Sequence, residues 1–125
     1  MDRDKPEPRA TLVDAPSLAG GADARGVRWG GASEDLNVTL LSWPAGDGVA
    51  PHVNNEVDVA LIAVSGAGEI VVDGEPFTVA AGQALLIPKG RERAIRAVSE
   101  RFSYLSVHRR RPGLMPTVRG KPVRP

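Results

Sequence analysis

Short runs in which apolar and polar residues alternate dominate the middle of the chain. Residues 36–43 read LNVTLLSW, and in this run leucine and valine alternate with Asn37 and Thr39. Strict alternation over such a length is typical of a β-strand with one buried face. Residues 57–64, VDVALIAV, are more continuously apolar, which predicts a strand buried more deeply than the first.

Further segments have the length and composition of strands and are separated by glycine and proline. They are residues 26–31, 69–79, 83–88, 93–98 and 102–108. Within residues 69–79, the dipeptide Asp73-Gly74 predicts a hairpin with a type I′ turn. No segment keeps an apolar period of 3.6 residues, so the pattern predicts an all-β domain, either a sandwich or a barrel.

The two ends of the chain differ from this middle part. Residues 1–10 are polar and contain two prolines, which predicts a disordered N-terminus. Residues 112–125, PGLMPTVRGKPVRP, contain four prolines and two glycines and are therefore expected to form an extended tail. We divide the chain into a disordered segment (1–10), a single β domain (11–108) and a basic tail (109–125).

Charge is unevenly distributed along the chain. The net charge is +1, from 16 basic and 15 acidic residues. The tail holds six basic residues and no acidic ones, which leaves 10 basic and 15 acidic residues, a net charge of −5, on residues 1–108. The basic residues of the tail are Arg109, Arg110, Arg111, Arg119, Lys121 and Arg124. They form either a solvated tail or an arm for nucleic acid or another anion, and the absence of aromatic residues for base stacking weakens the case for nucleic acid.

Composition and motifs exclude several classes of protein. The chain has no cysteine, so it has no disulfide, thiolate zinc site or cysteine nucleophile. It contains no P-loop, GxGxxG, GxSxG or HExxH motif. The start of the chain lacks the apolar region of a signal peptide, and the longest apolar run, residues 59–64, is too short to span a bilayer. We expect a cytoplasmic protein that does not enter membranes.

Glycine, proline and histidine recur at spacings that resemble the two motifs of the cupin family. The first cupin motif is glycine, five residues, His-x-His, three or four residues, glutamate, six residues and glycine. Here Gly46, His52 and Gly66 keep that spacing, while Asn54 stands at the second histidine position and Val59 at the glutamate position.

The second cupin motif is glycine, five residues, Pro-x-Gly, two residues, histidine, three residues and asparagine. Gly82, Pro88 and Gly90 keep it, whereas Arg93 replaces the histidine and Ala97 the asparagine. The resemblance covers residues 36–108 and implies a single jelly-roll barrel, also called a double-stranded β-helix. It also implies a homodimer.

Metal-dependent cupins hold their metal with three histidines and a glutamate. In this chain only His52 remains of those four ligands. Val59 has no donor atom, the amide of Asn54 is a weak ligand, and the guanidinium of Arg93 is a cation without a free lone pair. We therefore expect no metal cofactor. The alternative is a relocated metal site formed by His52, Glu56, Asp58 and His108.

Arg93 is the most informative of the substituted positions. A cation that faces the interior needs acceptors, because an unpaired buried charge is costly. The acceptors could be the carboxylates of Glu56 or Asp58, or an anionic ligand held by the planar guanidinium. His52 and Asn54, two residues apart, are expected to point to the same side of one strand.

An apolar wall and one further polar group complete the expected site. Val59, Leu61 and Ala63 share one face of their strand and would line the interior. Tyr104 shares a face with Phe102 and His108, but the opposite face, with Ser103, Leu105 and Val107, is an equally good candidate for the core. The predicted ligand-binding residues are His52, Asn54, Arg93 and Tyr104.

The sequence supports three readings of function. In the first, a metal-independent module binds a small, anionic molecule inside the barrel. In the second, the protein is an enzyme, either a metal-dependent oxygenase or isomerase with relocated ligands, or an isomerase that uses His52 as a general base. In the third, the barrel is a scaffold and the basic tail binds a partner. Catalytic residues and the identity of the ligand cannot be read from the sequence.

Overall fold

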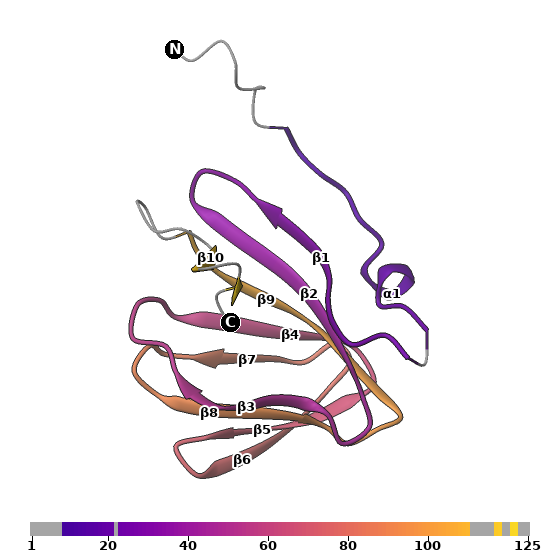
Figure 1. The fold of residues 1–125 in the computed structure, drawn as a ribbon, viewed down its shortest axis with the longest axis vertical. Coiled ribbons are helices and arrows are strands. Elements are labelled where there is room, and N and C mark those ends of the chain that lie inside the picture. Colours follow the sequence, from indigo (N-terminus) through magenta and orange to yellow (C-terminus); the bar gives the residue numbers. More distant parts are fainter. Residues whose placement is uncertain (1–8, 22, 111–116, 119–120, 123–125) are drawn as a thin grey trace.

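The computed structural model describes residues 9–21, 23–110, 117–118 and 121–122. Its main body consists of two antiparallel sheets that face each other (Figure 1). The five-stranded sheet has the order β1 (Gly26–Ala32), β2 (Leu36–Pro44), β9 (Arg101–Arg109), β4 (Val59–Ser65) and β7 (Ala84–Ile87). The four-stranded sheet has the order β3 (Gly48–Val53), β8 (Glu92–Ala97), β5 (Ala67–Val72) and β6 (Glu75–Ala80). This arrangement confirms the predicted all-β jelly roll, although the two sheets do not close into a continuous barrel.

The remaining elements are short. Helix α1 (Ala15–Leu18) is a single turn that is capped by Asp14, whose carboxylate accepts a hydrogen bond from the backbone N–H of Ser17. Strands β10 (Thr117–Val118) and β11 (Lys121–Pro122) pair with each other. No helix in the described ranges is long and apolar enough to cross a membrane. Residues 1–8 of the segment predicted to be disordered and most of the predicted tail lie outside the described residues.

In the two large sheets, the predicted strands agree with the observed ones to within two residues. The sequence analysis did not predict the two-residue strands β10 and β11, and it missed one strand of the large sheets. The missed strand is β3, which contains Gly48 and Pro51. Proline removes a backbone donor and is tolerated mainly at the edge of a sheet, and β3 is an edge strand. Its pairing with β8 is irregular between Val49 and His52, so its residues do not alternate strictly.

The β5–β6 hairpin has the turn that the sequence predicted. Asp73 and Gly74 have φ values of 49° and 83°, and positive φ at both central residues is what a type I′ turn requires. The Asp73 carboxylate also accepts hydrogen bonds from the Glu92 N–H (2.9 Å) and from the Arg91 guanidinium (3.1 Å). These contacts join the hairpin to the start of β8.

The hydrophobic core lies between the two sheets. Val59, Leu61 and Ala63 of β4 are buried in it, as predicted for the apolar wall. Phe102 and Tyr104 of β9 are fully buried in the same cluster, with ring centroids 5.1 Å apart. This observation decides which face of β9 points inward.

Two glycines allow the sheets to meet at this end of the core. A Cβ atom on Gly68 would lie 2.3 Å from the ring of Phe102, and one on Gly66 would lie 1.7 Å from the carbonyl oxygen of Arg101. Gly66 also has a φ of 70°, a conformation that costs other residues energy. The glycine that ends the first motif is therefore required by the backbone.

The N-terminal segment of residues 14–21 and 23–25, which includes α1, lies against the five-stranded sheet (Figure 1). The Arg101 guanidinium donates to the Ala24 carbonyl at 2.6 Å and to the Ser42 hydroxyl at 2.7 Å. The Ser42 and Ser103 hydroxyls are 2.9 Å apart, and both residues are fully buried. This network fixes the N-terminal segment to strands β2 and β9.

Candidate functional site

Polar side chains line one end of the interior on the five-stranded sheet. Asn37 of β2 lies opposite His108 of β9, and Thr39 lies opposite Ser106. Residues that face each other across antiparallel strands share a side of the sheet, and this side is the one that carries Tyr104. The alternation in residues 36–43 predicted the strand but did not show that its polar positions face the interior.

Arg93 and His52 occupy the corresponding end of the four-stranded sheet. The two residues lie opposite each other on β8 and β3. The irregular pairing before His52 brings the imidazole to the side of Arg93, because one extra residue in β3 changes the face to which the side chain points. His52 is half-buried, and its Nδ1 atom lies 3.0 Å from the Ala50 carbonyl oxygen.

The guanidinium of Arg93 is almost completely buried, with 1% of the residue exposed. Its Nε atom donates to the Arg91 carbonyl at 3.0 Å, and Nη2 donates to the Pro88 carbonyl at 3.4 Å. Nη1 has no hydrogen-bond partner among the described residues. Burial lowers the pKa of Arg93 from its usual value, and the negative charge of Asp73 partly opposes this effect.

The hydrogen bonds of Arg93 therefore go to neutral carbonyls rather than to the carboxylates that the sequence suggested. Asp58 is exposed, and its carboxylate accepts a hydrogen bond from the backbone N–H of Lys89 at 2.9 Å. The carboxylate whose charge acts on Arg93 belongs instead to Asp73, in the β5–β6 turn.

Asn54 lies beyond the end of β3, in the loop that leads to β4. Its side-chain oxygen accepts hydrogen bonds from the N–H groups of Glu56 (2.9 Å) and Val57 (3.2 Å), which fixes the loop. The prediction that Asn54 shares a strand face with His52 is therefore wrong, because the strand ends at Val53. Its Nδ2 atom is buried and has no partner in the described part of the chain.

Tyr104 faces the interior, but it lies deep in the apolar part of the core. Its hydroxyl accepts a hydrogen bond from Trp43 Nε1 at 3.1 Å. Burial raises the pKa of Tyr104 to about 12, and the hydrogen bond from Trp43 offsets part of this increase. Ser106, one position nearer to the polar end on the same face, is fully buried, and its hydroxyl has no partner among the described residues.

The donor groups do not match a metal site at the motif positions. Val59 is buried and has no donor atom, and the Asn54 oxygen already accepts two backbone hydrogen bonds. Arg93 would place a positive charge beside a cation. No group of three or more histidine, aspartate or glutamate residues in the described ranges is arranged to hold a metal ion. In the relocated set, His108 is half-buried, with Nδ1 3.0 Å from the carbonyl oxygen of Arg109.

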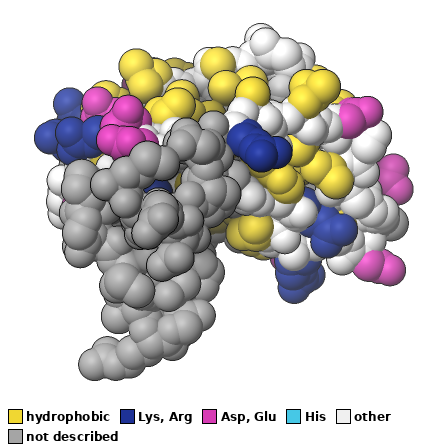
Figure 2. All heavy atoms as spheres, turned by 90° about the horizontal axis from the view of Figure 1, so that it is seen from above, with side chains coloured by type: hydrophobic (Ala, Val, Ile, Leu, Met, Phe, Trp, Pro, Cys, Tyr) yellow, Lys and Arg dark blue, Asp and Glu magenta, His cyan; other side chains and the backbone are white. Residues whose placement is uncertain are grey.

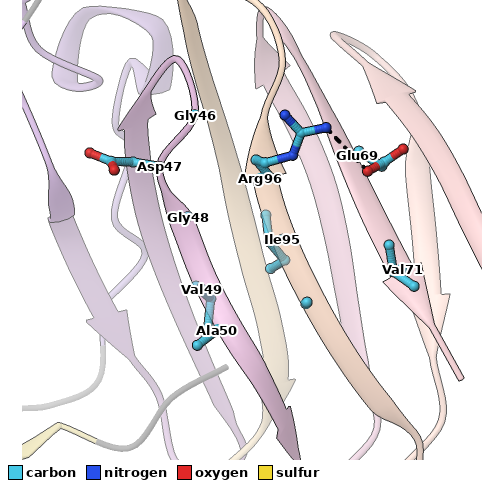
Figure 3. Close-up of a pocket in the computed structure, with 10 residues that line it drawn as sticks. Gly46, Asp47, Gly48, Val49, Ala50, Glu69, Val71, Ile95 and Arg96 are labelled. Carbon is cyan, nitrogen blue, oxygen red and sulfur yellow. Dashed lines mark hydrogen bonds and ion pairs between the residues drawn. The ribbon is translucent and has the colours of Figure 1, made fainter. Parts of the chain in front are cut away.

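The hollow that the structure shows lies elsewhere, on the outer face of the four-stranded sheet (Figure 3). It has a volume of about 350 Å³ and crosses β3, β8 and β5. The sequence analysis missed it, although small residues at outward positions, such as Gly48, Ala50 and Ala94, were a readable signal. We name it the outer hollow and treat it separately from the interior, because Nη1 of Arg93 and the hydroxyl of Ser106, two of the buried groups without a partner among the described residues, lie between the sheets.

The basic tail, for which a nucleic-acid arm was the alternative to a solvated tail, falls mostly outside the described residues. Of its basic residues, Arg110 is held against the body, where Nη1 donates to the Ser33 carbonyl at 3.2 Å and its backbone N–H to the Asp35 carbonyl at 2.7 Å. In the described part of the face shown in Figure 2, basic and acidic side chains lie among apolar ones.

Sequence and structure comparisons identify relatives of the chain. The family model described as Cupin domain matches residues 39–108, more than half of the chain. No match was found among curated proteins.

Several solved structures have the same fold. A conserved protein of unknown function from Streptococcus pyogenes is 28% identical, with a TM-score of 0.70, over 86% of this chain and 93% of that one. KdgF from Halomonas sp. is 21% identical, with a TM-score of 0.62, over 68% of this chain and 78% of that one. A protein from Bacillus halodurans is 21% identical, with a TM-score of 0.69, over 86% of both chains. At identities of 21% the likeness concerns the fold alone.

Proposed function

This chain belongs to the cupin family, and we propose that it binds a small anion between its two sheets without a metal. Membership of the family makes it a small-molecule-binding or enzymatic module of the cupin kind. The binding group is the guanidinium of Arg93. Side chains from the polar end of the interior, His52 and His108 among them, surround the ligand.

The observation that carries this proposal is the unsatisfied burial of Arg93. A charged group that is 1% exposed normally has a charged partner or a complete set of hydrogen bonds. Arg93 has one good hydrogen bond and one long one, both to neutral carbonyls, and its Nη1 atom has no partner in the described part of the chain. An anionic oxygen would supply the missing acceptor, and its negative charge would add to that of Asp73.

The chemistry of the ligand follows from the geometry of a guanidinium. Its planar donors match the two oxygens of a carboxylate or of a phosphate, which it can hold through paired hydrogen bonds. Further donors are close in the fold, because His52 lies opposite Arg93 and the Asn54 Nδ2 atom is buried without a partner among the described residues. We therefore expect an anion with oxygens that accept several hydrogen bonds.

The test measures the binding of acetate, citrate and inorganic phosphate by isothermal titration calorimetry, in the presence of a chelator. The Arg93→Met variant removes the charge but keeps a long apolar side chain. Charged hydrogen bonds contribute roughly 1.5–3 kcal/mol each, so we expect the loss of one to weaken binding about tenfold to about 150-fold. Arg28→Met, an exposed arginine on β1, is the matched control and should leave binding unchanged.

The outcomes separate the parts of the proposal. A preference for carboxylates or for phosphate identifies the class of ligand. If Arg93→Met binds these probes as tightly as the parent protein does, Arg93 is not the binding group. If a chelator removes all binding, and elemental analysis of the purified protein finds a stoichiometric metal that is lost in His52→Ala, the metal-independent function is wrong.

A further inference from the structure

Asp73, in the turn between β5 and β6, lies beside the start of β8, the strand that carries Arg93. Val72 pairs with Arg93 across the two strands, and the backbone N–H of Asp73 donates to the Glu92 carbonyl at 2.8 Å. The carboxylate is held at both oxygens: one accepts from the Glu92 N–H (2.9 Å) and the other from the Arg91 guanidinium (3.1 Å). These bonds fix a negative charge next to the proposed binding group.

The carboxylate acts on Arg93 through its charge. Among the described residues, the donors of Arg93 reach the carbonyls of Arg91 and Pro88, and Nη1 has no partner. Burial lowers the pKa of Arg93, and the negative charge of Asp73 opposes that decrease. Asp73 therefore offsets part of the charge of the guanidinium and leaves Nη1 open to another acceptor.

The fixed charges at this point leave a single positive charge for a ligand. We name Asp73, Arg91 and Arg93 the charged corner, and its two cations and one anion have a net charge of +1. Lys89 and Glu92, the other charged residues between Pro88 and Arg93, are exposed and opposite in sign. One negative charge on a ligand neutralises the corner, whereas each further negative charge is repelled by Asp73 without a fixed cation to balance it.

We propose that Asp73 makes the interior select singly charged anions, such as a monocarboxylate, over anions with two or three negative charges. The inference rests on the proposed function, because it concerns the ligand that Arg93 binds. Arg93 attracts every anion, and Asp73 reduces this attraction in proportion to the charge of the ligand. Asp73 is thus a residue that determines specificity without contacting the ligand.

The exposure of Asp73 limits the size of the effect. Its side chain is 44% exposed, so water screens its charge much as it screens charge pairs at a protein surface. Interactions of that kind change an affinity by roughly 1.5-fold to fivefold for each unit of ligand charge. For a ligand with three charges, the same factor multiplies to roughly threefold to 100-fold.

The Asp73→Asn variant tests the proposal because it removes the charge and keeps the turn. Asparagine retains an oxygen that can accept from the Glu92 N–H, and Asn-Gly is favoured in type I′ turns. Isothermal titration calorimetry compares acetate, succinate and citrate, which carry one, two and three negative charges at about pH 8. Affinity should rise in Asp73→Asn by a factor that is smallest for acetate and largest for citrate. Each factor compares one ligand in two proteins, so the size of the ligand cancels.

Two controls separate this effect from other consequences of the substitution. Glu100→Gln removes one negative charge from an exposed residue beyond the opposite end of β8, and it should leave the order of the three affinities unchanged. Asp73→Asn also releases Arg91, so the gain is measured again in the Arg91→Met background. It should persist there, because it arises from the missing carboxylate and not from a freed guanidinium.

Urea denaturation gives a second readout that needs no ligand. Asp73→Asn should raise the equilibrium constant of unfolding more in the parent protein than in Arg93→Met, by a factor of at least about two. The difference arises because only the parent protein has a buried cation for Asp73 to stabilise. A turn that merely tolerates the residue would give the same change in both backgrounds.

The results distinguish the inference from the proposed function. Equal gains for the three ligands, a gain that disappears in the Arg91→Met background, or equal changes of stability with and without Arg93 would overturn the role of Asp73. Binding that still depends on Arg93 would then leave the proposed function intact. If neither the parent protein nor Asp73→Asn binds any of the three anions, the proposed function is wrong and the inference fails with it.

Discussion

Replacing Arg93 with methionine should make the unliganded protein more stable, although it removes the proposed binding group. The side chain is 1% exposed, so folding strips the guanidinium of its water. In return it gains one hydrogen bond of 3.0 Å and one of 3.4 Å, and Nη1 gains none from the described residues. Methionine has a similar length, no polar atoms and enough flexibility to fill the space.

The magnitude follows from this balance. An unsatisfied buried donor costs about 1–3 kcal/mol, and the two hydrogen bonds to carbonyls return roughly 1 kcal/mol each at most. The desolvation of the charge adds several kcal/mol to the cost, and replacement of buried charges by apolar residues has stabilised other proteins by about 1–4 kcal/mol. We expect Arg93→Met to raise the free energy of unfolding by about 1–2 kcal/mol, measured by urea denaturation with an unchanged m-value.

Arg101 provides the matched comparison. Its Nη2 atom, like Nη1 of Arg93, is buried without a partner among the described residues. Its Nη1 atom, however, makes short hydrogen bonds to the Ala24 carbonyl (2.6 Å) and the Ser42 hydroxyl (2.7 Å), which fix the N-terminal segment to the sheet. Arg101→Met should therefore destabilise the protein by about 2–3 kcal/mol. If Arg93→Met is instead destabilising by more than about 1 kcal/mol, the guanidinium is satisfied in the free protein, and the reasoning from its unpartnered atom is refuted.

Two further predictions concern the core. Gly66→Ala should lower the free energy of unfolding, measured by urea denaturation, by at least about 3 kcal/mol, because its Cβ would lie 1.7 Å from a backbone oxygen. Gly46→Ala, with a φ of 85° and open space around it, should lower it by only about 1–2 kcal/mol. Equal losses of stability in the two variants would show that φ alone matters. The single tyrosine, Tyr104, should ionise near pH 12 in the folded protein when tyrosinate absorbance is followed. Burial raises the pKa of Tyr104 above the unfolded value of about 10. Its contribution to stability is therefore complete below about pH 10, declines as the pH rises from about 10 to about 12, and is absent above that. Ionisation near pH 10 without unfolding would contradict the buried position of the side chain.

The fold could be predicted because its determinants are local. Asp73-Gly74 specifies a turn through the φ values that it allows, and the motif glycines specify bends for the same reason. Strand β3 escaped prediction because its position at an edge relaxes the requirement for strand-forming residues. The irregular pairing before His52 also depends on which strand lies beside it, and the sequence of β3 alone does not contain that information.

The site was predictable in position but not in its contacts. The motif spacing placed His52 and Arg93 together, and the structure pairs them. The role of Asn54 depends on where β3 ends, and the inward direction of Asn37 and Thr39 depends on both faces of β2 being covered. Leu40, on the other face of β2, is fully buried, so the alternation of apolar and polar residues did not distinguish inside from outside.

On the proposed function, Arg93 would allow a cupin framework without the usual metal ligands to bind an anion. The metal of a metal-dependent cupin places positive charge at the centre of the motif residues, where it attracts anionic oxygens. Arginine at one of those positions places a permanent positive charge in the same region, with directional donors in place of open coordination sites. It cannot exchange electrons or lower the pKa of a bound water as a metal does. On the proposed function, the substitution would therefore retain recognition of anions while giving up metal-centred chemistry, and ligand binding should stabilise the protein most in the variants that retain Arg93.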